Sequence, residues 1–300
     1  MGYRACCPSS FSSFIVNLRE VLLFFMLATP FQHKPVIYGS ELNDLLFFNA
    51  ISVHAVIALV ALVSGVGALA VRKGSLVHLR FGRAFVISMY WTAVTGILLD
   101  VLRLAFYVEE NHTKYLDYSM PSSYPARFAF LFAGLCVLYM IRQGGLRTIL
   151  SSVGPVFGWG DRLASLALIV LGVGLSGLIY FRYNPWTGAL WMIWTFLAIL
   201  CFSVRMAEMG GWLGWRERNR ALHRFHMIFL LVFCGWASLQ GFGPAIALRL
   251  TGVDNSIPVY TGNQPGDYGP GFWWFLLAWA PVFLLGLYLL RRFSRPIRQS

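Results

Sequence analysis

Residues 46–70 read LFFNAISVHAVIALVALVSGVGALA, an apolar stretch in which His54 is the only ionisable side chain. A helix needs about 20 mainly apolar residues to cross the hydrocarbon of a bilayer, so this stretch is long enough to span it. Across the chain, 58% of the 300 residues are hydrophobic and 12% are charged. That is about half the charged share of a soluble domain. The sequence therefore predicts an integral membrane protein and excludes a soluble enzyme, a disordered protein and a coiled coil.

The other apolar stretches predict an all-α fold, a polytopic bundle of transmembrane helices that forms a single domain over residues 1–300. An N-terminal stretch at 11–31 adds an eighth predicted span; the alternative is that it lies in the membrane interface, because charged residues stand near its start. The seven clear spans are 46–70, 84–106, 126–141, 163–181, 186–206, 225–248 and 272–290.

The distribution of charge predicts the orientation of these spans. Most of the 24 Lys and Arg residues fall in the connections 71–83, 142–162 and 205–224 and in the tail after residue 290. The intervening connections 107–125 and 250–271 are poor in them. Basic connections stay in the cytoplasm, so we expect the C-terminus to be cytoplasmic. This topology explains the net charge of +12, so the bilayer is the predicted partner and nucleic acid is not.

Small residues predict where the helices pack closely, because lipid gives them no hydrophobic reason to associate. The first clear span carries Ala61 and Gly65 four residues apart, and the span at 225–248 carries Ala237 and Gly241 in the same way. The span at 163–181 carries Gly172, Gly174 and Gly177.

Two ionisable residues inside neighbouring spans predict an intramembrane polar pair. His54 stands about eight residues into its span, and Asp100 stands about six residues from the end of the next, antiparallel span, so their depths match. Ionisable groups within a membrane face the bundle interior and find partners there. We therefore expect His54 and Asp100 to share one space between helices. The alternative is that Asp100 pairs with Arg103, three residues further along the same helix.

Three more histidines stand where predicted spans meet the cytoplasm. His78 precedes the second clear span, and His223 and His226 precede the sixth. Imidazoles at one depth on two helices could ligate a haem iron, here haem b, with arginines meeting the propionates. The alternative is that these side chains bind lipid phosphate. The candidate haem or metal ligands are His54, His78, His223 and His226, and the candidate contacts to propionates or anionic headgroups are Arg80, Arg83 and Arg224.

The stretch from residue 54 to about residue 100 resembles the multi-pass bacterial membrane proteins grouped as Domain of Unknown Function 2306. That family has an in-membrane histidine, a glycine-rich helical turn, a basic loop, and then His-x-x-x-Gly-Arg at the start of the next helix. Leu79 departs from the arginine that often follows the second histidine. The resemblance implies a polytopic fold in a bacterial inner membrane and no established activity. The matching positions are His54, Gly65, Arg72, Lys73, His78, Gly82 and Arg83.

Three functions fit these patterns. The first is a redox-linked or haem-associated membrane protein that uses the histidines. The second is a transporter or proton-linked sensor with the His54–Asp100 site. The third is a non-catalytic accessory subunit that packs against membrane-protein partners in a larger complex. Whether the chain is an enzyme stays open, because no catalytic residue is identified.

Overall fold

The structure, a computed structural model, describes residues 40–107, 124–146, 158–182, 187–208 and 222–238, together with Leu284 and Tyr288. In this part of the chain the elements are helices and there is no strand, which confirms the all-α fold class. The elements are α2 (Glu41–Ala70), α3 (Leu76–Leu102), η1 (Arg103–Tyr107), α5 (Tyr124–Ile141), η2 (Arg142–Leu146), α7 (Trp159–Arg182) and α8 (Thr187–Glu208). A further helix, the 222–238 helix, covers Leu222–Ser238. η1 and η2 are π-helical turns that continue α3 and α5.

Within the described residues, four helices are long and apolar enough to cross a membrane. The structure therefore supports the predicted spans 46–70, 84–106, 126–141 and 163–181. α8 and the 222–238 helix contribute shorter apolar helices, Ala189–Arg205 and Leu222–Ser238. The predicted spans 11–31 and 272–290 lie outside the described residues, apart from Leu284 and Tyr288, and so does the second half of 225–248. The total of seven or eight spans stays a prediction. The four membrane-length helices are Leu45–Ala70, Leu76–Ala105, Arg127–Gly145 and Trp159–Arg182.

α2 and α3 form an antiparallel pair joined by the short connection 71–75. Each begins with a serine cap, because the Ser40 hydroxyl accepts from the backbone N–H of Asn43 at 3.2 Å and the Ser75 hydroxyl accepts from that of His78 at 3.1 Å. Such caps satisfy N–H groups that the first helical turn leaves without a partner. Gly74 has a φ of 81° in the connection, a conformation that suits glycine.

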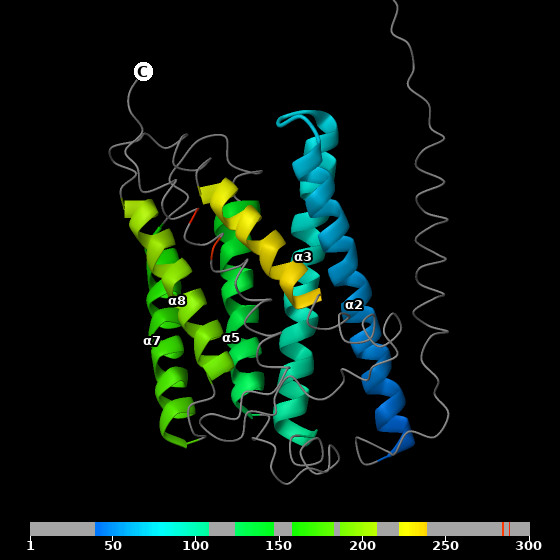
Figure 1. Ribbon diagram of the computed structural model, residues 1–300, viewed down its shortest axis with the longest axis vertical. Coiled ribbons are helices and arrows are strands. Elements are labelled where there is room, and N and C mark those ends of the chain that lie inside the picture. The colour runs from blue at the N-terminus through cyan, green and yellow to red at the C-terminus, as the bar shows by residue number, and fades with distance from the viewer. Residues whose placement is uncertain are drawn as a thin grey trace, which may run out of the picture.

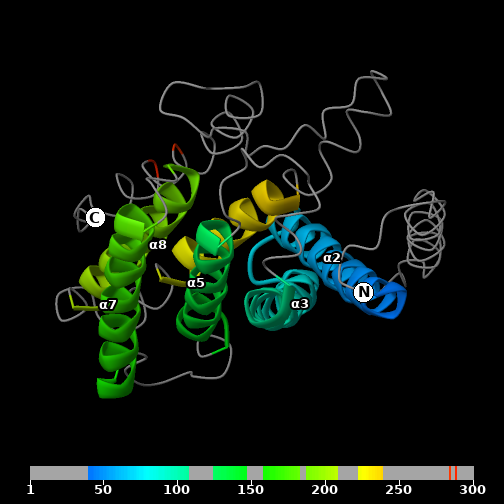
Figure 2. The ribbon, with the colours of Figure 1, turned by 90° about the horizontal axis from the view of Figure 1, so that it is seen from below.

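Figure 1 shows the helices standing roughly side by side, with α2 and α3 next to each other, α5 in the middle, and α7 and α8 beyond it. In the end-on view of Figure 2, the 222–238 helix (yellow) crosses the bundle between α8 and α2. Its side chains contact three neighbours: Cys234 donates to the backbone of α2, while His226 and His223 contact α8 and η2. This helix therefore connects α2 with α8 and η2.

The core is built mainly from aromatic and aliphatic side chains of α5, α8 and the 222–238 helix. The Phe196 ring meets the edges of Phe229 and Phe233, with centroids 5.6 and 5.0 Å away, and Trp236 stacks on Phe233 at 5.6 Å. Edge-to-face contacts of this kind add to the stabilisation from burial. Many large apolar side chains of α2, α3 and α7 are exposed, as lipid-facing side chains are in a membrane bundle.

Close packing at small residues is confirmed for the first predicted set. Ala61 is fully buried, and a Cβ added at Gly65 would stand 2.6 Å from Leu231 and 3.0 Å from Phe85. Gly172 is also packed, beneath Phe132 and Leu197. At Gly174 and Gly177 no described atom lies within 4 Å of where a Cβ would be, so close packing there stays a prediction. Gly241 lies outside the described residues.

Candidate functional site

Asp100 and Arg127 form a buried ion pair between α3 and α5. The Arg127 Nη1 donates to Asp100 Oδ1 at 3.0 Å, and Asp100 is 6% exposed. Arg103 also acts electrostatically on Asp100, so the arginine predicted as the alternative partner is nearby. An isolated charge within a membrane-length helix is costly. The pair with Arg127 offsets part of that cost.

His54 lies on α2 and is held by Thr95 on α3. Its Nδ1 is 2.8 Å from Thr95 Oγ1, and that hydroxyl donates its one hydrogen to the Trp91 carbonyl at 2.7 Å. Because the hydroxyl hydrogen is already used, Thr95 Oγ1 accepts from the His54 Nδ1–H. The neutral imidazole then carries its lone pair on Nε2. Gly96 leaves room for the ring, since a Cβ there would stand 3.2 Å from His54 Cε1.

The structure gives His54 and Asp100 different hydrogen-bond partners, Thr95 and Arg127, and their sharing of one space between helices stays a prediction. His54 faces Thr95 and Gly96, and Asp100 lies about one helical turn, roughly 6 Å, further along α3. The predicted depths of His54 and Asp100 assumed that each helix ends where its apolar stretch ends. In fact α2 begins at Glu41 and α3 begins at Leu76. These earlier starts change which residues of α2 and α3 lie at the same depth. His54, Thr95, Asp100 and Arg127 are called the polar layer below.

A second group of histidines lies at the other end of α3, near the 71–75 connection. His78 Nδ1 is 2.9 Å from the Ala68 carbonyl, and His223 Nδ1 is 2.7 Å from the Gly144 carbonyl. A carbonyl oxygen only accepts, so both Nδ1 atoms donate and both Nε2 atoms keep their lone pairs. His78 also acts electrostatically on His223. The structure thus brings together the two segments that the sequence placed at one membrane boundary.

His226 is fully buried beside this group. Its Nε2 is 2.7 Å from Ser203 Oγ on α8, and the Ser203 hydroxyl donates to the Ile199 carbonyl at 2.8 Å. His226 Nε2–H is therefore the donor, and its lone pair is on Nδ1. His226 packs directly against the Gly144 backbone: a Cβ added at Gly144 would stand 2.6 Å from His226 Cβ.

The four candidate haem and metal ligands lie at two levels of the bundle. Among the described residues, no group of three or more His, Cys, Asp or Glu side chains could hold a metal ion. Nε2 of His226 bonds to Ser203, and His54 lies about 21 Å along α2 from Ala68, whose carbonyl binds His78. Haem association stays a prediction for all four histidines. Arg80, Arg83 and Arg224 are exposed at the same end, and their contacts with propionates or headgroups also stay predictions.

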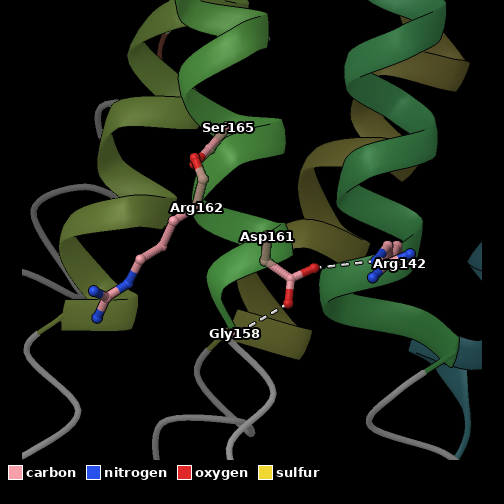
Figure 3. Close-up of polar contacts among 5 residues, drawn as sticks. All are labelled: Arg142, Gly158, Asp161, Arg162 and Ser165. Carbon is pink, nitrogen blue, oxygen red and sulfur yellow. Dashed lines mark hydrogen bonds and ion pairs between the residues drawn. The ribbon is translucent and has the colours of Figure 1, made fainter.

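A second ion pair joins Arg142 of η2 to Asp161 of α7 at this end of the bundle. Figure 3 shows the two side chains pointing toward each other, while Arg162 points away. Arg142 Nε donates to Asp161 Oδ1 at 3.1 Å, and the Gly158 N–H donates to Oδ2 at 3.0 Å. A carboxylate in the first turn also meets the positive end of the helix dipole. This pair therefore fixes where α7 begins.

Sequence reasoning missed Thr95, Arg127, Arg142, Asp161, Gln143 and Ser203. Arg127 was the easiest of these residues to predict. It stands near the start of the apolar stretch 126–141, at the membrane side whose connections are poor in basic residues. The hydroxyl and amide side chains give no signal of their own in a sequence.

No known protein family, curated protein or solved structure matches the chain. The resemblance of residues 54–100 to Domain of Unknown Function 2306 therefore stays a prediction.

Proposed function

We propose that this protein is a multi-pass protein of a bacterial inner membrane that moves protons across the bilayer through its polar layer. One observation carries the proposal: Asp100 is buried and ion-paired with Arg127 between two membrane-length helices, one turn from His54. Ionisable side chains at such positions are the ones that form proton relays in pumps and transporters. Histidine changes its charge near neutral pH, which suits it to that role.

The contacts suggest how a proton would be handled. An ionised Asp100 is held by Arg127, and a protonated Asp100 loses most of that attraction. The carboxyl group therefore has two states that differ in how strongly Arg127 binds it. His54 presents an Nε2 lone pair one turn away, able to accept a proton while Nδ1–H stays bonded to Thr95. The two groups lie on facing helices, so a small shift of α2 against α3 changes their separation.

The arginines support the proposed orientation. Arg80, Arg83, Arg142, Arg162 and Arg224 are all exposed, and the antiparallel order of the helices gathers them at the end that holds the 71–75 connection. Basic residues concentrate on the cytoplasmic side of bacterial membrane proteins. We propose that this end faces the cytoplasm, and that the C-terminus lies on the same side.

The proposal is tested by proton flux into proteoliposomes that contain a pH-sensitive dye and carry a potassium diffusion potential. We expect the wild-type protein to acidify the lumen and Asp100→Asn to reduce this flux to that of protein-free liposomes, because the amide cannot release a proton. Asp161→Asn is the matched control: it also removes a buried, arginine-paired carboxylate, but at the end of the bundle. Its flux should equal that of wild type.

Two outcomes would contradict the proposal. One is a wild-type flux no greater than that of empty liposomes, and the other is an Asp100→Asn flux equal to wild type. Matched helical circular dichroism of the two variants shows whether each has folded.

A further inference from the structure

Three buried polar side chains stand at one level of the bundle, on η2, α8 and the 222–238 helix. Gln143 and Ser203 are each 3% exposed and His226 is fully buried. Ser203 is bonded to His226, and the Gly144 backbone lies against the His226 ring. Gln143 precedes Gly144, so all three residues stand at one level of the bundle.

The neighbours of Gln143 in the chain fix the direction in which it points. Arg142 contacts Asp161 of α7, and Gly144 contacts His226 of the 222–238 helix. Gly145 contacts Val86 of α3. α8 is the remaining described helix that packs against α5, and Gln143 falls between Arg142 and Gly144 around the helix axis. Gln143 therefore turns toward α8, the helix that carries Ser203.

Two of these side chains have polar atoms that nothing in the described part of the chain satisfies. They are Oε1 and Nε2 of Gln143 and Nδ1 of His226. Burying a polar atom without a hydrogen bond costs roughly 1–3 kcal/mol, so three such atoms at one level point to a ligand that bonds to them. The atoms present two acceptors, His226 Nδ1 and the Gln143 oxygen, together with the two N–H donors of the amide.

We infer that Gln143, Ser203 and His226 form a site for a small neutral hydroxylic ligand, of which water is the smallest. The ligand O–H donates to His226 Nδ1, and its oxygen accepts from the Gln143 amide. An anion would face the lone pair of His226, and a bare cation would leave the amide N–H groups unbonded. The inference does not depend on proton movement, because the site lies about 14 to 21 Å along α3 from the polar layer.

The test is solid-state NMR of the full chain in lipid bilayers, with ¹⁵N-labelled histidine and ¹⁵N-labelled glutamine side chains. The His226 signals are assigned by their loss in His226→Asn. We expect His226 Nδ1 to resonate as a hydrogen-bonded, unprotonated nitrogen and to receive magnetisation from water. In Gln143→Leu, which keeps a similar size, the transfer from water should fall several-fold. Ser165→Ala is the control, because Ser165 is equally buried but lies on α7, where its hydroxyl donates to the carbonyl of Arg162.

The outcomes separate water from a retained solute. A hydrogen-bonded Nδ1 that receives magnetisation from water identifies water. A hydrogen-bonded Nδ1 without that transfer, changed by Gln143→Leu, identifies a hydroxylic solute that remains through purification. A wild-type Nδ1 with the shift of a nitrogen free of hydrogen bonds, or one that Gln143→Leu does not change, overturns the inference. The wild-type spectrum alone shows whether Nδ1 is hydrogen-bonded, even if a variant fails to fold.

Discussion

Replacing Arg127 with methionine is expected to lower the free energy of unfolding by about 3 kcal/mol, because it leaves the Asp100 carboxylate buried without its partner. Asp100 is 6% exposed, and Arg127 donates the hydrogen bond that the structure gives to its carboxylate. Methionine keeps the length and apolar stem of the side chain, so the loss reports on charge more than on packing. The measurement is reversible unfolding in mixed micelles of increasing denaturing detergent, followed by tryptophan fluorescence.

Arg142→Met is the matched control for this prediction. Asp161 keeps the Gly158 N–H and the helix dipole of α7, and 58% of the Arg142 side chain is exposed, so we expect a loss of about 1 kcal/mol. Adding Asp100→Asn to Arg127→Met should restore part of the stability, since the unpaired Asp100 carboxylate is then removed. Equal losses for the two arginine variants would show that the Asp100–Arg127 pair is not buried as described.

Gly144→Ala is expected to destabilise the protein by about 2–3 kcal/mol, although it adds a single methyl group. The new Cβ would stand 2.6 Å from the Cβ of His226 and 3.0 Å from its Nδ1. A Cβ is fixed to the backbone and does not move aside as the end of a flexible side chain does, so η2 and the 222–238 helix must separate. The same shift lengthens the bond from His223 to the Gly144 carbonyl. Detergent-induced unfolding measures the loss.

Gly174→Ala serves as its control, because no described atom lies within 4 Å of the added methyl group. Alanine in a helix interior is favoured over glycine by about 0.5–1 kcal/mol, so this variant should be as stable as wild type or slightly more stable. If Gly144→Ala proves equally harmless, the 222–238 helix does not pack against η2 as described.

Hydropathy predicted the helices well, because lipid requires long, uninterrupted apolar helices. Residues 46–70 and 84–106 correspond to α2 and to α3 with η1, and the basic residues beside His78 and His223 led to the grouping of these two histidines. Side-chain partners were harder to predict. The His54–Asp100 pair depended on the relative shift of two helices, and a shift of about one turn gives each residue another partner.

The residues that sequence reasoning missed share a physical reason. Arg127 pairs with Asp100 only because α5 packs antiparallel beside α3, a contact between segments separated by a connection outside the described residues. Gln143 matters because of the direction in which it points from a π-helical turn, and apolar periodicity does not reveal such a turn. Neither tertiary contacts nor helix irregularities can be read from composition or spacing.

The membrane depth of the polar layer decides whether a proton path runs through the bilayer. Leu98, which is 56% exposed on α3 close to Asp100, is changed to cysteine in a chain whose five native cysteines are replaced, and is labelled with a nitroxide in liposomes. Arg80→Cys, at the other end of α3, is labelled as the comparison. We predict frequent collisions with oxygen and few with a water-soluble nickel complex at position 98, and the reverse at position 80. Equal access of the nickel complex to both positions would place the polar layer in water and contradict the proposal of a proton path within the membrane.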